Sequence, residues 1–349
     1  MKKKKFLTVL LAILMLSLVV TGCGKTATTT DGDQGKEPTV WKFVHEEYPG
    51  DYQDTYAQLF KKSIEEKTDG QVTIEIYPVG QLGNNAQGTE LIQSGGVELG
   101  LTDPGAMGAF LKEANIMMLH FLLPDNLTKV QDFFDNSKTM KLLNEMHTEK
   151  GLHVIRWVPE GYFVWMGNKP LRTPEDFKGF KIRTMAAPII AASFEAYGAS
   201  ATPIPYAEVY SALQLGVVDG QTNPLSADDN MKFYEVTDYA TFANSDIYNF
   251  TFVMNDKFWN SLDPEMQQLV IDADQEANAE YTANLSKDDK AIIDRWRNEK
   301  LIEIVNITPE ERQVFYDLSQ SVYEKYRAEG GPRAGELLDL YYSEIDSYK

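Results

Sequence analysis

The chain reads VWKFV at residues 40–44, VTIEIY at 72–77 and VELGLT at 97–102, three short apolar stretches. The middle stretch alternates apolar and polar residues, which predicts a half-buried strand. Between the first two stretches, apolar residues fall at helical spacing, at Tyr56, Leu59, Phe60 and Ile64. A second helical stretch ends at Gly95-Gly96. Strands that alternate with helices in this order favour a mainly parallel sheet covered by helices.

The remainder of the chain continues the same two periodicities. We expect a helix at 130–150 and strands at 152–158 and 162–166, followed by helices at 187–197 and 206–215 and a brief strand and turn at 217–220. Thr-Pro-Glu starts at Thr173 and Thr308, and Asp-Pro-Glu starts at Asp263, so each predicts a helix start. The pattern after Asp263 runs to about residue 297 without Pro or Gly, which predicts an unusually long helix.

The N-terminus has the form of an export signal. Four lysines, at residues 2–5, precede an apolar run from Phe6 to Val20, and the run meets Val20-Thr21-Gly22-Cys23. The run is shorter than the about 20 residues of a membrane-spanning helix. This segment resembles a bacterial lipoprotein signal, in which the cysteine is lipidated and becomes the mature N-terminus. The alternative is a secretory signal with an incidental cysteine, although Cys23 is the only cysteine in the chain.

Charge and motif content exclude several classes of function. The formal net charge is −19, which argues against a nucleic-acid partner. We find no Gly-x-Ser-x-Gly elbow, no phosphate-binding loop and no His-Glu-x-x-His, and the four histidines have no metal-ligand spacing. These absences lower the expectation of an enzyme, and no cofactor or metal is expected.

Three later segments carry a family resemblance. They are KGFKIR at residues 178–183, EVYSALQ at 208–214 and VDGQTNP at 218–224, supported by Tyr77-Pro78 with Gln81-Leu82-Gly83 and by KFYEV at 232–236. Together and in this order they resemble the solute-binding proteins of tripartite ATP-independent periplasmic (TRAP) transporters, of the DctP type. The resemblance runs from about Val40 to the last helices, which is nearly the whole chain after the signal.

The resemblance implies an α/β, two-lobed, periplasmic-binding-protein-like fold with a long C-terminal helix that bridges the lobes. We expect a signal peptide at 1–22 and a flexible tether at 23–38. Lobe I would comprise 39–160 and 249–288, lobe II would comprise 161–248 and 289–330, and a C-terminal helix would occupy 331–349.

The resemblance also implies ligand-binding residues. Arg183 occupies the family position that binds the ligand carboxylate, and a guanidinium meets both carboxylate oxygens at once. Asn223 occupies the position that donates its amide to the same carboxylate, the alternative being a turn residue before Pro224. Tyr206 is either an aromatic wall of the cleft or a packing residue. Asp103 is either a ligand contact or a helix cap, and His45 and Glu46 follow the first strand at the usual binding edge.

The sequence departs from the family pattern at Phe163. Many members have an arginine there, so a second ligand carboxylate would lack its counter-ion, which is costly. This favours a monocarboxylate over a C4-dicarboxylate, with Phe163 either in an apolar or aromatic wall or packed in the core. Arg156 is a possible substitute for the missing charge. Glu160 is an acid that would meet a ligand hydroxyl or amine.

The expected function is therefore capture of a small organic acid outside the cell. The lobes close on the acid, the closed form delivers it to the membrane subunits of a TRAP transporter, and the protein is held at the membrane by a lipid on Cys23. Two alternatives remain, namely the same fold used as a ligand sensor for a receptor, and an extracellular lipoprotein enzyme.

Overall fold

A strand of 16 residues, β4 (Leu152–Gly167), connects the two parts of the central sheet. The structure is a computed structural model, and it describes residues 38–348. The expected signal peptide, nearly all of the expected tether and Cys23 lie outside the described residues. None of the helices within 38–348 is both long enough and apolar enough to span a membrane.

The first part of the sheet contains the three stretches that open the chain. β1 (Thr39–Val44) lies between β2 (Val72–Tyr77) and β3 (Leu99–Thr102), and both pairings are parallel. Next to β3 runs β9 (Ile247–Asn255), which is antiparallel both to β3 and to the first half of β4. The three opening stretches therefore form the parallel sheet that their order predicts. β9 runs antiparallel to β3 and to β4, so the sheet as a whole is mixed.

The second part of the sheet starts where β4 changes neighbours, at Phe163. From there β4 pairs with β7 (Gly220–Pro224), which is followed by β5 (Lys181–Thr184) and β6 (Ser200–Pro203). β8 (Tyr239–Phe242) and β10 (Glu303–Asn306) form a parallel pair that joins the sheet through β4. The brief strand and turn expected at 217–220 are therefore displaced, since β7 begins only at Gly220.

Local signals placed most helix boundaries correctly. α13 (Pro309–Glu329) starts with a capping box between Thr308 and Glu311, and α8 (Pro188–Tyr197) ends at Gly198 with φ of 105°, a value that glycine tolerates. The remaining helices are α2 (Tyr52–Lys67), α3 (Asn85–Ser94), α4 (Pro104–Met107), α5 (Leu127–Asn136), α6 (Lys138–Glu149), α7 (Pro174–Phe177), α9 (Val209–Gln214), α10 (Leu225–Asn230), α11 (Asp256–Ser261), α12 (Pro264–Asn298) and α14 (Ala334–Glu344).

Two predicted elements differ from the structure. The single helix expected at 130–150 is broken into α5 and α6, because the Ser137 hydroxyl accepts the backbone N–H of Met140 and caps a new helix there. The two strands expected at 152–158 and 162–166 are one continuous strand, β4. Its pairing with β9 has register shifts between Val154 and Arg156 and between Pro159 and Gly161.

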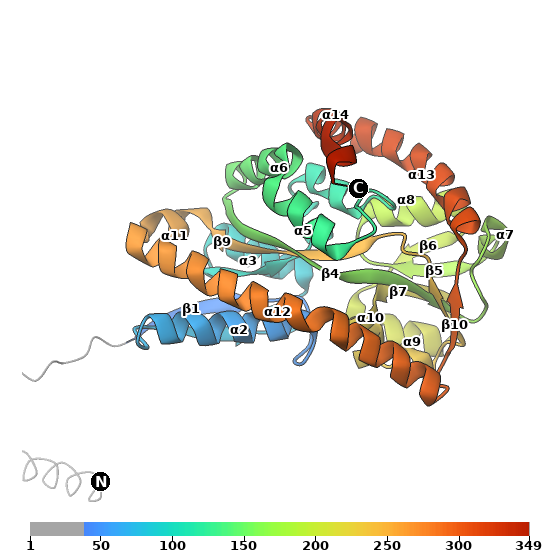
Figure 1. The fold of residues 1–349 in the computed structure, drawn as a ribbon, viewed down its shortest axis with the longest axis horizontal. Helices are drawn as coiled ribbons and strands as arrows, with labels where there is room; N and C mark the ends of the chain where they lie inside the picture. The colour runs from blue at the N-terminus through green and yellow to red at the C-terminus, as the bar shows by residue number, and fades with distance from the viewer. Residues whose placement is uncertain (1–37, 349) are drawn as a thin grey trace, which may run out of the picture. The chain divides into compact units, whose positions relative to one another are not determined.

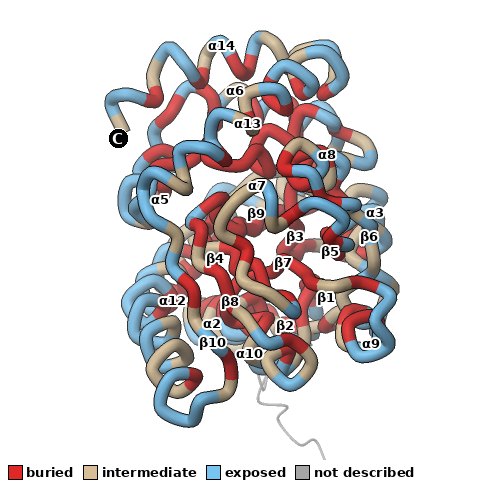
Figure 2. Tube along the Cα trace, turned by 90° about the vertical axis from the view of Figure 1, so that its right-hand side faces the viewer, coloured by how far each residue is buried: buried red, intermediate tan, exposed pale blue. Residues whose placement is uncertain are grey.

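The long helix was predicted correctly, and it belongs to two hydrophobic clusters. α12 has 35 residues, and Figure 1 shows it running past α2 at one end and past α9 and α10 at the other. Its Tyr281 and Leu285 pack with the aromatic cluster beneath α2, whereas Trp296 packs with the cluster around α9. Figure 2 shows buried residues along the strands and exposed ones on the outer faces of the helices. The division of the sequence into lobes by residue range stays a prediction.

Candidate functional site

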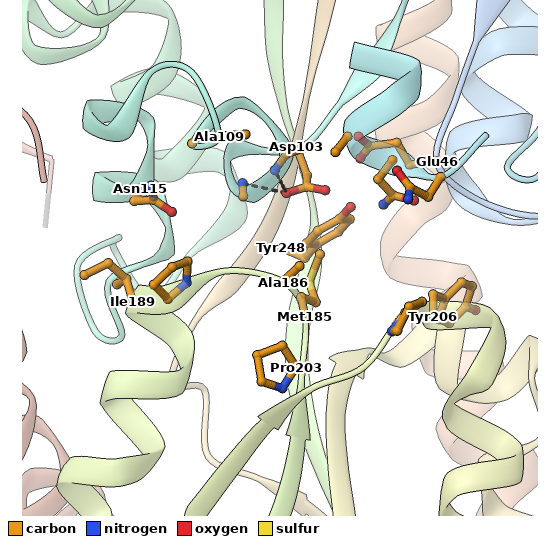
Figure 3. Close-up of a pocket in the computed structure, with 18 of the residues that line it drawn as sticks. Glu46, Asp103, Ala109, Asn115, Met185, Ala186, Ile189, Pro203, Tyr206 and Tyr248 are labelled. Carbon is orange, nitrogen blue, oxygen red and sulfur yellow. Dashed lines mark hydrogen bonds between the residues drawn. The ribbon is translucent and has the colours of Figure 1, made fainter. Parts of the chain in front are cut away.

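The candidate site is a cavity of about 590 Å³ between the two parts of the sheet (Figure 3). Glu46 and Asp103 follow β1 and β3, Arg183 and Asn223 lie near the ends of β5 and β7, and Tyr248 lies at the start of the antiparallel β9. These side chains meet because β3 and β7 run in opposite directions and both end near the middle of β4, so the carboxyl ends of β1 and β3 face those of β5 and β7. The structure thus brings together segments that are far apart in the sequence.

Arg183 is buried, and two backbone oxygens and the side-chain oxygen of Asn223 hold it in place. Its Nε donates to the carbonyl oxygen of Ile204 at 2.9 Å, and its Nη1 donates to Thr222 O at 3.3 Å and to Asn223 Oδ1 at 3.0 Å. No hydrogen-bond partner for Nη2 lies within residues 38–348. Burial lowers the pKa of Arg183 to about 10, so the side chain is still a cation at neutral pH. Arg183 therefore presents a fixed and partly unsatisfied positive charge to the cavity.

Asn223 lies within β7, paired with Val164, so the alternative of a turn residue is wrong. It lines the cavity, but both ends of its amide contact protein. Its Oδ1 accepts from Arg183, and its Nδ2 donates to Gln221 Oε1. In this structure Asn223 orients the arginine.

Tyrosine rings form the centre and one side of the cavity. The Tyr206 hydroxyl donates to Ala227 O at 3.2 Å, and its ring lies 5.7 Å from the ring of Tyr48. Tyr248 lies between Asp103 and Met185 in Figure 3 and accepts a hydrogen bond from Gln53 Nε2 at 3.3 Å. Burial raises the pKa of both Tyr206 and Tyr248 far above the ordinary value, so both hydroxyls stay protonated.

Acidic side chains line the cavity on the side of β1 and β3. Glu46 shares a carboxyl–carboxyl hydrogen bond with Asp103, and burial together with the Asp103 charge holds the pKa of Glu46 well above its usual range. Burial and the nearby Asp51 raise the pKa of Glu47 to about 8. Asp103 is also a helix cap, since its Oδ1 accepts from Gly105 N and Ala106 N at 2.6 and 3.0 Å. Among residues 38–348 no group of three or more His, Cys, Asp or Glu side chains is arranged to hold a metal ion.

Comparison with known proteins identifies the family. The sequence model of the DctP family, described as bacterial extracellular solute-binding protein, family 7, matches residues 43–329. This chain belongs to that family. Among its relatives is the ectoine-binding periplasmic protein TeaA of Halomonas elongata, 34% identical over 87% of this chain and 89% of TeaA. A solved structure of the same ectoine-binding protein has a TM-score of 0.84 at 32% identity, and the match covers 88% of this chain and 99% of the other.

Other relatives are named for other ligands. A TRAP solute-binding protein from Desulfovibrio salexigens, solved with bound orotic acid, has a TM-score of 0.84 at 30% identity, covering 89% of this chain and 99% of that one. The C4-dicarboxylate-binding protein DctP of Vibrio cholerae is 28% identical over 79% of this chain and 82% of that protein. This protein is thus an extracytoplasmic solute-binding protein of the TRAP type, which binds small organic acids and works with membrane subunits, and it is not an enzyme.

Five of the residues expected at the site of this family 7 protein line the cavity, and three do not. The five are Arg183, Asn223, Tyr206, Asp103 and Glu46. Phe163 is buried behind the wall, with its ring 5.6 Å from the ring of Tyr248. Tyr248 therefore stands where we expected Phe163, because residue 163 of β4 points its ring toward β9 rather than into the cavity.

His45 and Glu160 belong to the layer behind the acidic wall. His45 Nδ1 accepts from Glu47 N at 3.4 Å, its Nε2 lies 3.4 Å from Asp54, and burial lowers its pKa to about 4. Glu160 Oε1 accepts from Ser226 Oγ at 3.2 Å, and its carboxyl is hydrogen-bonded to Glu47. Both residues support Glu47 and do not line the cavity.

Arg156 does not replace the missing arginine. Its Nε donates to Asp274 on α12 at 2.7 Å, and its Nη1 lies 3.5 Å from Asp135. The charge of Arg156 is therefore already paired outside the cavity, and it is not among the lining residues.

Sequence reasoning missed two important lining residues, Tyr248 and Glu47. Tyr248 lies in a strand that is buried throughout, so no alternation marks the side that meets the cavity. Glu47 is next to Glu46 and was within reach of the same argument about loops that follow strands. Two lysines at the mouth, Lys112 and Lys325, are exposed and carried no sequence signal.

Proposed function

We propose that this protein captures a small monocarboxylate that also has a cationic group, and delivers it to the membrane subunits of a TRAP transporter. One observation carries the proposal. The same cavity has a buried arginine, Arg183, on the β5 side and the buried acids Glu46, Glu47 and Asp103 on the β1 and β3 side. A zwitterion is the ligand whose charges complement both walls.

The carboxylate end of the ligand would bind at Arg183. Its Nη2 is free to donate, and the guanidinium is already oriented by Ile204 O and Asn223 Oδ1. A preoriented arginine loses little conformational freedom when it binds an oxygen anion. A carboxylate bound there would also place a negative charge beside the buried cation, which compensates in part for its lost hydration shell.

The cationic end of the ligand would face Glu46 and Glu47. In the ligand-free protein their raised pKa values keep protons on carboxyl groups that lack a cation. A ligand cation would replace those protons and stabilise the carboxylates, as a charge-assisted hydrogen bond does. Ectoine, the ligand named for the relative TeaA, has this combination of a carboxylate and a delocalised cation.

A dicarboxylate fits the cavity less well. Its second carboxylate would lie among Glu46, Glu47 and Asp103 with no cation from the described residues beside it, and a buried carboxylate without a counter-ion is costly. The only lysines that line the cavity within residues 38–348 are Lys112 and Lys325, and both are exposed at its mouth, where water weakens their attraction. Phe163 supplies no second cation.

Capture would close the cleft. Two contacts join the loop after β1 to the α9 and α10 side, namely the rings of Tyr48 and Tyr206 and a hydrogen bond from Asn230 Nδ2 to Asp51. A ligand held from both sides favours the closed population. The lipid on Cys23 is part of the proposal, and replacing Cys23 with Ser should release the protein from membranes in cell fractionation.

Isothermal titration of protein refolded from denaturant, which removes any carried-over ligand, tests the proposal. We expect ectoine to bind more tightly than orotic acid, and succinate to bind weakly or not at all. Replacing Arg183 with Ala should abolish ectoine binding. Replacing Arg172, which pairs with Glu311 outside the cavity, with Ala is the matched control and should leave it unchanged. Tight binding of succinate with no binding of any monocarboxylate would contradict the proposal.

A further inference from the structure

A chain of buried polar side chains runs from Arg183 away from the cavity and ends on Asp228. Arg183 Nη1 donates to Asn223 Oδ1 at 3.0 Å, Asn223 Nδ2 donates to Gln221 Oε1, and Gln221 Nε2 donates to Asp228 Oδ1 at 2.7 Å. The exposed fraction of these four residues is between 0 and 4%. Water therefore does not compete for these hydrogen bonds.

The direction of this chain is set at its two ends. A guanidinium only donates, so Asn223 must turn its oxygen toward Arg183 and its nitrogen toward Gln221. Gln221 must then turn its oxygen toward Asn223 and its nitrogen away. An acceptor is needed at the far end to hold that orientation, and Asp228 Oδ1 is that acceptor.

We infer that Asp228 is a positioning residue, which fixes the Arg183 guanidinium through Gln221 and Asn223 and thereby sets how tightly a ligand carboxylate is bound. This inference rests on the proposed function, in which Arg183 binds that carboxylate. Asp228 itself does not line the cavity, so it acts through the amides and not by contact with ligand.

Asp228 has no role in stabilising the fold that is comparable to its role in orienting these amides. It is fully buried, and its Oδ2 has no hydrogen-bond partner within residues 38–348. Burial raises its pKa well above the ordinary value, and the charge of Arg183 opposes that rise. A buried carboxyl with one unpaired oxygen costs stability relative to an apolar side chain.

The neighbouring acid on α10 provides a contrast. Asp229 accepts from Trp296 Nε1 at 2.8 Å and from Arg295, both on α12. Asp229 therefore holds α10 against α12. The two adjacent acids have separate partners, so Asp229 is a matched control for Asp228.

The test replaces each residue in the whole protein and observes Arg183 directly. In ligand-free protein labelled with ¹⁵N-arginine, a fixed guanidinium gives separate Nη–H resonances, whereas a rotating one gives an averaged signal. The Arg183 resonances are assigned with Arg183→Lys. Ectoine affinity is then measured by isothermal titration for Asp228→Leu, Asp228→Asn and Asp229→Leu.

We expect Asp228→Leu to average the Arg183 resonances and to weaken ectoine binding at least tenfold. Asp228→Asn keeps an acceptor oxygen for Gln221, so it should preserve the separate resonances. Asp229→Leu should lower stability without changing the resonances. If Asp228→Leu does not fold, Gln221→Met, which removes both amide contacts, replaces it with the same expectation.

Two results would overturn the inference. One is a folded Asp228→Leu protein with wild-type Arg183 resonances, and the other is an equal change in the Asp229→Leu control. The proposed function fails by a different result, retained ectoine binding in Arg183→Ala. The resonances of the ligand-free protein decide the role of Asp228 in either case.

Discussion

Glu47 should make binding of a cationic ligand depend on pH. Its carboxyl is buried, its Oε2 accepts from Gln53 N at 2.9 Å, and burial with the nearby Asp51 raises its pKa to about 8. A ligand cation beside it stabilises the ionised form. Binding at pH 7 therefore has to release the proton that Glu47 holds in the ligand-free protein, and this linkage has a calculable size.

The magnitude follows from the pKa. A group with a pKa of about 8 is about 90% protonated at pH 7, so ectoine should release close to one proton from Glu47 at that pH. The ionised fraction falls about 50-fold between pH 8 and pH 6, so the Kd should rise by about the same factor, or about 2.3 kcal/mol. Neutralising Glu47 by Glu47→Gln should remove the part of the proton release and of the pH dependence that comes from Glu47, and leave the part that comes from Glu46.

Isothermal titration of ectoine at pH 6, 7 and 8, in buffers of different ionisation enthalpy, measures the protons released. Orotic acid, which has no cationic group, is the control ligand and should release none at this site. The reasoning about the acidic wall is refuted if the Kd for ectoine changes less than threefold between pH 8 and pH 6 and no proton is released.

Three further predictions concern Arg183, the acids Glu46 and Glu47, and Phe163. Arg183→Lys should weaken carboxylate binding at least tenfold in a titration, because an ammonium cannot keep the contacts to Ile204 O and Asn223 Oδ1 and also present the donor that Nη2 presents to the ligand; wild-type affinity would show that the arginine is not the anchor. The free energy of unfolding of the ligand-free protein, measured with urea, should fall as the pH rises from 5 to 8. The reason is that Glu47 and Glu46 keep protons in the folded state that they lose in the unfolded one, and each contributes at most about 1.4 kcal/mol per pH unit. A flat profile would contradict the raised pKa values. Phe163→Ala should lower the free energy of unfolding by about 3–5 kcal/mol, because it removes a buried ring that packs on Tyr248; a loss of ectoine affinity with unchanged stability would instead place Phe163 in contact with ligand.

Much of the local structure and part of the site were predictable from the sequence. Helix starts at Thr308 and Asp263 depend on residues within one turn, so their signals are local and were interpreted correctly. The Arg183 and Asn223 positions came from segments with family-like spacing, and both line the cavity. The break at Ser137 was missed because the apolar pattern of α5 continues into α6.

The facing of side chains along β4 was not predictable. Counting by twos along a strand assigns faces only when the pairing is regular, and β4 has register shifts at Val154/Arg156 and Pro159/Gly161. Each shift changes which residues face the cavity. Phe163 was expected at the ligand because it matches the position of the family's arginine, and Glu160 because it is an acid that could meet a ligand hydroxyl or amine. The structure puts both of them behind the wall.

Sequence alone determined the family, the α/β class, the long helix and the arginine that faces the cavity, because each of these depends on short-range pattern or on motif order. Tertiary structure decided what surrounds that arginine. Glu47 and Glu160 are far apart in the chain, yet their carboxyls share a hydrogen bond, and Asp228 reaches Arg183 only through two intervening amides. Such interactions between charged and polar groups depend on burial and on distances in space, and the spacing of residues along the chain does not encode either of these.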